Sequence, residues 1–388
     1  MPAMPSYTIL FSGMMAGDPY QGGATWAVLQ YVLGLQRLGH TVLFVEPVRR
    51  ESLKPQHVSL RDSDNASYFR QVVQRFGLEA CAALLLAESQ ETVGMDYAHL
   101  HEAARQADLL INVSGMLTDP ELLAAVPVRV YLDLDPAFIQ LWHQVQQIDM
   151  RLDAHTHFVT VGQAIGRKGC SIPTCGKTWM PTLQPVVLDA WPVSDQIRYH
   201  AFTTIANWRG YGSIHHRGLV YGQKAHSLRR FMTLPRCTPE TFSLALSIHP
   251  DEHKDLAALA ENNWDLLDPV HVAGTPERYR RFIQGSKAEL GIAKSGYIVS
   301  RCGWFSDRSA CYLASGKPVL AQDTGFSAFL PTGEGLFAFR TTDEAVAHVE
   351  SINQEYALHS KAARMLAERY FDSDIVLARL VQWLEETS

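Results

Sequence analysis

A group of side chains suited to holding an anion stands at residues 306–309, where a helix is expected to begin. Ser306 and Ser309 offer hydroxyl groups, and Arg308 offers a guanidinium that can form a bidentate, charge-assisted pair with a phosphate. The first turn of a helix adds unpaired N–H groups and the positive end of the helix dipole. The combination predicts a phosphate contact. The simpler alternative is that Ser306 only caps the helix and Arg308 faces solvent.

A glycine-containing loop is expected between the first strand and the first helix, at residues 12–26. Gly22 and Gly23 let the backbone approach a ligand closely or take positive φ values. Asp18 lies in the same loop, and a carboxylate placed there can act as a general base. The alternative for Asp18 is a turn residue before Pro19.

The elements that must position these residues alternate regularly along the chain. Short apolar runs that end in Gly, Asp or Pro are followed by segments of helical period, which predicts repeated β-α-β units and parallel sheets. The expected strands are 7–13, 41–47, 107–115, 128–136, 157–162, 202–208, 242–250, 264–269, 288–294, 318–323 and 336–339. Residues 48–95 are expected to form helices inserted after the second strand, and 342–369 a further helical segment.

The periodicity fails at residues 164–198, a stretch rich in proline and glycine that is the best linker candidate. We therefore predict an α/β fold with two Rossmann-like domains that face each other across a cleft. The first domain would cover residues 1–190 and the second 191–370, with a final helix at 371–388. Sheets of this kind bind ligands in the crevice at the carboxyl ends of their strands.

Composition excludes several other classes of protein. The 388 residues are 47% hydrophobic and 19% charged, with 34 basic and 40 acidic side chains and a net charge of -6. No long run of one sign offers a sequence-independent grip on nucleic acid or on an anionic membrane. The longest apolar run, at 81–87, is far below the ~18 residues that span a bilayer. We expect a cytoplasmic protein with no integral membrane segment, and six free cysteines rather than a metal site, because no CxxC occurs.

The stretch 306–345 resembles the nucleotide-sugar region of GT-B glycosyltransferases, and the chain looks like an uncharacterised bacterial glycosyltransferase-like group. The matching pieces are Ala314-Ser315-Gly316, Lys317-Pro318-Val319, Asp323-Thr324-Gly325-Phe326, Gly333-Glu334-Gly335 and Thr342-Asp343-Glu344. The resemblance implies the GT-B fold, a final helix that crosses back to the first domain, and sugar transfer from a UDP-, TDP- or GDP-sugar. It implies no permanently bound cofactor.

The same resemblance implies roles for basic residues of the second domain. Arg209 and Lys224 fit the two positions whose cations neutralise the leaving diphosphate, so that no metal ion is required. Lys294 is a third candidate. Surface cations are the alternative for each of these residues. The loop of Thr324, Gly325 and Phe326 would lie beside the transferred sugar, and a plain glycine turn is the alternative there.

The resemblance also indicates which acidic residues could take part in catalysis. An inverting transferase takes its base from the first domain, and Asp18 is our first choice, with Asp133 and Asp135 next. The D-x-D spacing of Asp133 and Asp135 also occurs in metal sites of a single-domain glycosyltransferase fold, which the two-domain pattern contradicts. Retaining GT-B enzymes carry two glutamates, and Gly303 and Cys311 occupy those places here, which leaves the stereochemistry open.

Two other functions fit the same fold. A nucleotide-sugar 2-epimerase would use the same donor pocket, but it needs carboxylates around the sugar. A non-catalytic nucleotide-sugar-binding protein needs none. The acceptor of a transferase stays open between a small molecule, a glycan, a protein and a nucleic-acid base.

Overall fold

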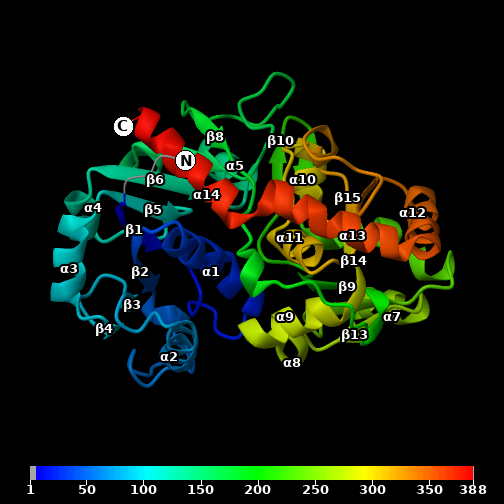
Figure 1. Ribbon diagram of the computed structural model, residues 1–388, viewed down its shortest axis with the longest axis horizontal. Helices are drawn as coiled ribbons and strands as arrows, with labels where there is room; N and C mark the ends of the chain where they lie inside the picture. The colour runs from blue at the N-terminus through cyan, green and yellow to red at the C-terminus, as the bar shows by residue number, and fades with distance from the viewer. Residues whose placement is uncertain (1–5, 388) are drawn as a thin grey trace.

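Short runs of buried side chains form the strands of two separate sheets in the computed structural model, which describes residues 6–387 (Figure 1). The first sheet has the strand order β4-β3-β2-β1-β5-β6-β7-β8, and within it only β4 pairs antiparallel with its neighbour. Its strands are β1 (Thr8–Ser12), β2 (Thr41–Val48), β3 (Ala82–Leu86), β4 (Thr92–Gly94), β5 (Leu109–Val113), β6 (Val128–Asp133), β7 (His157–Thr160) and β8 (Trp179–Pro181).

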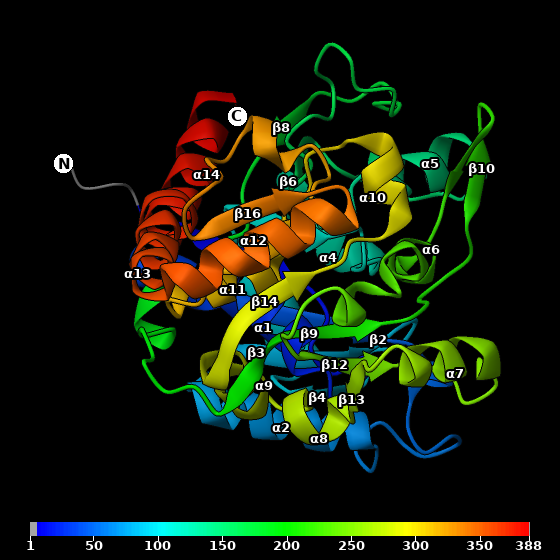
Figure 2. The same cartoon turned by 90° about the vertical axis from the view of Figure 1, so that its right-hand side faces the viewer.

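The second sheet is parallel throughout, in the order β13-β12-β9-β14-β15-β16. Its strands are β9 (Tyr199–Asn207), β12 (Phe242–Ser247), β13 (Asp265–Leu267), β14 (Ser286–Gly291), β15 (Val319–Gln322) and β16 (Leu336–Phe339). A separate hairpin of β10 (Ile214–His216) and β11 (Leu219–Tyr221) stands beside helix α10 (Ser295–Ser300) in Figure 2.

Helices connect successive strands of both sheets. Those of the first half are α1 (Gly22–Arg37), α2 (Asp64–Phe76), α3 (Tyr97–Gln106), α4 (Pro120–Ala125) and α5 (Phe138–Gln144). Those of the second half are α6 (Lys224–Leu228), α7 (His253–Glu261), α8 (Pro269–Ala273), α9 (Pro276–Gly285), α10, α11 (Asp307–Ala314), α12 (Thr342–Gln354), α13 (Tyr356–Leu366) and α14 (Ser373–Thr387). None of the helices in this described part of the chain combines the length and the apolarity that a bilayer crossing requires.

The arrangement confirms the predicted α/β fold class, because each sheet with its helices forms a Rossmann-like domain and the two domains face each other across a cleft. Parallel strands covered on both faces read as continuous apolar runs. The strand β5, in which every residue is buried, shows this directly.

The chain crosses between the domains at two places that pair with each other. Val186, in the segment after β8, accepts a hydrogen bond from the N–H of Ser373 (2.9 Å) and donates its own to the carbonyl of Phe371. Helix α14 then packs on α1 of the first domain (Figure 1). The contact is close, because a Cβ atom on Gly34 would lie 2.5 Å from Leu377 Cδ1.

Several expected elements are different in the structure. Residues 48–95 contain β3 and β4 besides α2, so the expectation of helices alone is wrong. All five residues of β3 are buried, and a run buried on both faces lacks the alternation that identifies a strand. The linker region 164–198 contributes β8, and 342–369 forms two helices rather than one.

Candidate functional site

A cavity of about 410 Å³ lies between the two domains. The first domain lines it with residues 20–24, at the end of the loop that follows β1. The second domain lines it from the ends of β9 and β14 and from the start of α11. Side chains from these segments include Asn207, Tyr211, Gln223, Lys224, Lys294, Tyr297, Trp304, Ser306, Asp307 and Arg308.

Gly22 and Gly23 line the cavity and also let the domains approach each other. A Cβ atom on Gly22 would lie 2.4 Å from the carbonyl oxygen of Ala273, and one on Gly23 would lie 2.9 Å from the ring of Tyr279. Both distances are shorter than any relaxed contact, so a larger residue at Gly22 would collide with the backbone of the second domain, and one at Gly23 would displace the ring of Tyr279. The close approach, and not a positive φ, is what these two positions require.

A buried glutamate holds the start of this loop. Glu46 of β2 is fully buried and accepts hydrogen bonds from the N–H groups of Met15 (2.9 Å), Ala16 (2.8 Å) and Gly17. Burial raises the pKa of its carboxyl to about 7. The sequence analysis did not select Glu46, although a lone acid inside the apolar run of β2 was a signal for it.

The side chains at the start of α11 that the sequence predicted to bind a phosphate are only partly available to a ligand. Ser306 is buried at the cavity wall and its hydroxyl caps no N–H of the helix. Arg308 also lines the cavity, but its Nε donates to Glu289 Oε1 (2.7 Å) and Nη1 donates to the carbonyl of Ile205 (2.9 Å). Its side chain is only 12% exposed, so the alternative in which Arg308 faces solvent is wrong.

Lys224 begins α6, and within the described residues no carboxylate lies within ion-pair distance of its Nζ. It is buried, and its Nζ donates to the carbonyl of Ile292. Burial lowers the pKa of this lysine well below its usual range, and the nearby charges of Arg308 and Lys294 lower it further. An anion in the cavity would offset this cost.

Lys294 joins the two domains. Its Nζ lies 3.1 Å from Asp135 Oδ2, in the loop after β6 of the first domain. The hydroxyls of Tyr211 and Tyr297 donate to the same carboxylate. The rings of Phe138, Tyr211 and Tyr297 surround Nζ at 4.4–5.3 Å, at which range cation–π attraction stabilises the ammonium. Asp135 therefore contacts three side chains at the cavity.

Asp133 has a different environment from Asp135. It is fully buried and accepts hydrogen bonds from the Asp135 N–H (2.9 Å), Gln140 Nε2 (2.8 Å) and Thr160 Oγ1 (2.8 Å). It lines none of the cavities described here, so it holds the loop of Asp135 rather than facing a ligand. Among residues 6–387 no group of three His, Cys, Asp or Glu side chains could hold a metal ion.

The burial of Asp133 makes stability depend on pH. Burial raises its pKa to about 7, whereas an aspartate in the unfolded chain titrates near ~4. Between these values the folded state binds more protons, so Asp133 alone should contribute a fall of about 3–4 kcal/mol in the free energy of unfolding as the pH rises from ~4 to ~7. Urea unfolding across this range should show a smaller fall for Asp133→Asn. The exposed control Asp251→Asn should keep the full slope, and an unchanged slope in Asp133→Asn would contradict the assignment.

Two of the predicted residues lie away from the cavity. Arg209 forms an ion pair with Glu252 at the start of α7, and Asp18 pairs with Lys54 Nζ at 2.5 Å. Neither side chain lines the cavity, so the expected convergence of Arg209 with Lys224 and Arg308 is wrong. Each of these side chains forms an ion pair with an oppositely charged residue, and the ion pair holds it away from the cavity.

The loop after β15 satisfies its own polar groups. The N–H of Gly325 donates to Asp323 Oδ1 (2.9 Å), and the hydroxyl of Thr324 donates to the carbonyl of Trp304. Gly325 has a φ of +95°, which favours glycine. The N–H of Gly325 is therefore not free to bind a sugar hydroxyl. Ser309, Thr324 and Phe326 line a small hollow that shares Ser306 and Arg308 with the main cavity.

Gly303 and Cys311, which stand where the resemblance places two glutamates, both lie in constrained surroundings. Gly303 has a φ of +75°, and a Cβ atom there would lie 3.0 Å from Gln163 Cβ. Cys311 is buried beneath the cleft, where its Sγ accepts from Gln30 Nε2 (3.6 Å). The structure instead places Asp307 at the cavity, with a pKa raised by burial, and this acid was not selected from the sequence.

Aromatic residues at the cavity were also missed. Tyr20, Tyr211, Tyr279, Tyr297 and Trp304 line it. They stand in loops or on short helices with no recognisable spacing, so the sequence carried no signal for them.

Comparisons with known proteins identify the fold of this chain but assign it to no family. No protein-family model matches the chain, and no curated protein matches it by sequence. Among solved structures, an alpha-glucosyltransferase in complex with UDP and a 13-mer DNA containing a HMU base is similar over 97% of this chain and 99% of that one, with a TM-score of 0.61 and 11% identity.

Two further structures are similar over nearly their whole length. Anabaena HepE in complex with UDP and glucose has a TM-score of 0.60 and 12% identity, over 98% of this chain and 99% of that one. A glycosyltransferase from Rickettsia africae has a TM-score of 0.52 and 11% identity, over 99% of both chains. The chain therefore has the GT-B fold.

Proposed function

We propose that this protein transfers a sugar from a UDP-sugar to an acceptor hydroxyl without a metal ion. The observation that carries the proposal is the buried Lys224, which faces the interdomain cavity with no carboxylate partner in the described residues and shares that cavity with Lys294 and Arg308. A diphosphate supplies the missing negative charge. UDP is the favoured nucleotide because the similar GT-B structures hold UDP or UDP-glucose.

The proposed roles follow from the placement of the side chains. Lys224 and Lys294 would stabilise the charge that grows on the β-phosphate as the glycosidic bond breaks. The N–H groups at the start of α11, beside Ser306, would hold the phosphates. We propose that residues 1–190 carry the acceptor side and 191–370 the donor side, with 371–388 tying the second domain to the first.

Among the three aspartates proposed as base, Asp135 has the best placement. It contacts Lys294, Tyr211 and Tyr297 at the cavity, whereas Asp133 is enclosed and Asp18 is paired with Lys54. A diphosphate that attracts Lys294 would weaken its ion pair with Asp135 and leave this carboxylate freer to accept a proton.

The proposal is tested by incubating the full chain with UDP-glucose, UDP-galactose and UDP-N-acetylglucosamine. Slow hydrolysis of the sugar, with water in place of the acceptor, is the expected result. Formation of the C2 epimer would identify a 2-epimerase instead. Tight binding without any turnover would identify a non-catalytic binding protein, for which the absence of a side chain at Gly303 gives some support.

Metal independence gives a separate prediction. Excess EDTA should leave the hydrolysis rate unchanged, because Lys224 and Lys294 supply the positive charge at the leaving group. Rates measured with EDTA, and after adding back Mg²⁺ or Mn²⁺, check this. Loss of the activity in EDTA and its return with either metal would contradict the proposed mechanism.

A further inference from the structure

A second and larger cavity, of about 840 Å³, lies entirely in the first domain. Its wall comes from the loops that follow four strands, namely residues 14–17 after β1, 47–52 after β2, 87–89 after β3 and 114–118 after β5, together with Arg151. This is the carboxyl edge of a parallel sheet, where such sheets bind ligands. The mechanism above makes no use of it.

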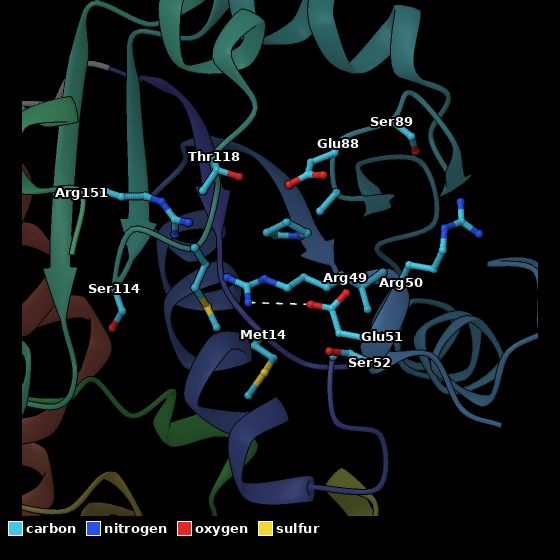
Figure 3. A pocket seen from close by; sticks show the side chains of 15 residues that line it. Met14, Arg49, Arg50, Glu51, Ser52, Glu88, Ser89, Ser114, Thr118 and Arg151 are labelled. Atoms are coloured by element: carbon cyan, nitrogen blue, oxygen red, sulfur yellow. Dashed lines mark ion pairs between the residues drawn. The ribbon is translucent and has the colours of Figure 1, made fainter. Parts of the chain in front are cut away.

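Two arginines, Arg49 and Arg151, extend into this cavity. Figure 3 shows the side chains of Arg49 and Arg151 extending into it from different walls. Arg49 forms an ion pair with Glu51 at an N–O distance of 3.9 Å, drawn as a dashed line in Figure 3, which is too long for a hydrogen bond and leaves the guanidinium N–H donors of Arg49 free of any hydrogen bond within residues 6–387. Arg151 donates to the carbonyl of Gly115 (3.3 Å) and has no ion pair in the described residues. Their guanidinium groups are available to an anion.

The backbone around the cavity holds an unusual conformation at three places. Glu88, Ser114 and Arg151 have φ values of 60°, 51° and 58°, in the left-handed region that side chains disfavour. Residues held in this region cluster at ligand sites. All three lie in the wall of this one cavity.

Polar groups other than the arginines also face the cavity. The side chain of Glu88 reaches toward Thr118 in Figure 3, and both line the cavity. A carboxylate and a hydroxyl are suited to the hydroxyl groups of a sugar. The ligand that fits this set has an anionic end for Arg49 and Arg151 and hydroxyl groups for Glu88 and Thr118.

The two cavities share one loop. The segment between β1 and α1 gives Met14 and Gly17 to the first-domain cavity and residues 20–24 to the interdomain cavity. Glu46 fixes this segment through three backbone N–H groups. This loop therefore borders both the first-domain cavity and the cavity of the proposed diphosphate.

We propose that the first-domain cavity binds the acceptor and that the acceptor is a small phosphorylated sugar. Its phosphate binds between Arg49 and Arg151, since paired guanidinium groups match phosphate oxygens. A nucleic-acid acceptor is disfavoured because the chain carries a net charge of -6 and no basic run to follow a polyanion. This inference rests on the proposed sugar transfer.

The reaction balances without a further reactant. An acceptor hydroxyl oxygen forms a bond to the anomeric carbon of the donor. The bond from that carbon to the β-phosphate oxygen breaks, and its electron pair leaves with UDP. The hydroxyl proton passes to a carboxylate base and then to water.

Calorimetry on the full chain tests the inference with four probes, namely glucose 6-phosphate, inorganic phosphate, glucose and glucuronic acid. Each is titrated with and without saturating UDP. Glucose 6-phosphate should bind more tightly than the other three. Arg49→Ala and Arg151→Ala should each weaken its binding at least about tenfold, because each removes a charge-assisted contact. The matched control is Arg105→Ala, an exposed arginine of α3 in the same domain, and it should bind normally.

The outcomes separate this inference from the proposed function. Equal binding of glucose 6-phosphate to all variants, no binding of it, or tighter binding of glucuronic acid would overturn the phosphorylated acceptor. Normal UDP binding in the same titrations would leave sugar transfer standing. If the native chain does not bind UDP, the proposed function is overturned instead. Circular dichroism and thermal unfolding of each variant show that it is folded.

Discussion

Replacing Arg308 by alanine should lower the free energy of unfolding by about 3–5 kcal/mol. Glu289, its partner in β14, has a fully buried side chain, and its second carboxylate oxygen already lacks a hydrogen bond in the described structure. Removing the guanidinium leaves an uncompensated charge inside the domain. Urea unfolding followed by far-ultraviolet circular dichroism measures the loss.

The chain provides a matched control for this prediction. Arg209 also pairs with a glutamate, Glu252, but both side chains are partly exposed, at 40% and 25%. Exposed pairs contribute about 0–1 kcal/mol, so Arg209→Ala should unfold almost like the native protein. The double change of Arg308→Met with Glu289→Leu should recover much of the lost stability, because it removes both charges. If Arg308→Ala and Arg209→Ala lower the free energy of unfolding equally, the buried ion pair stabilises the fold no more than the exposed one.

Replacing Lys224 by methionine should weaken UDP binding by about 1.5–3 kcal/mol, the contribution of a hydrogen bond to a charged group. The same change should also abolish the proton uptake that we expect to accompany UDP binding to the native protein. The pKa of Lys224 is lowered well below its usual range, so above that pKa the free protein holds the amine neutral. A bound diphosphate favours the ammonium, and the protein then takes up a proton from solution.

UDP affinity should fall as the pH rises above the lowered pKa of Lys224, because each binding event must then protonate the amine. Calorimetry of UDP binding in two buffers with different ionisation enthalpies measures the uptake directly. Methionine keeps the apolar stem and removes only the charge. Native affinity in Lys224→Met, or a proton uptake that persists in it, would remove this lysine from the proposed diphosphate site.

Local sequence patterns were sufficient for the fold and for part of the cavity. Runs such as 109–113, which are largely apolar, are typical of interior strands of a covered parallel sheet. Parallel strands place their carboxyl ends at one edge. Ser306 and Arg308 stand at a helix start and could be assigned to the cleft from the sequence, whereas Lys224 and Lys294 were assigned through the resemblance to GT-B glycosyltransferases.

Pattern reasoning was less successful where a strand carried no alternation. Residues 82–86 form β3, and the expectation of helices in 48–95 missed it because an apolar run of five fits either structure. Missing β3 also meant missing a candidate functional residue. Glu88 follows β3, and its position in the first-domain cavity depends on the strand that precedes it.

Contacts between distant segments decided the rest. Arg308 and Arg209 are the same residue type near the same cleft, but one is enclosed with Glu289 and the other is held outside by Glu252. Asp133 and Asp135 are two residues apart, yet one is buried under three donors and the other bridges the domains to Lys294.

The first-domain cavity is likewise formed by loops that are far apart in sequence and adjacent only through the strand order β3-β2-β1-β5. Sequence by itself determined which residues could bear charge at strand ends. Only the tertiary structure determined which charges meet a partner and which face a cavity, because that depends on distances between segments that no local period encodes.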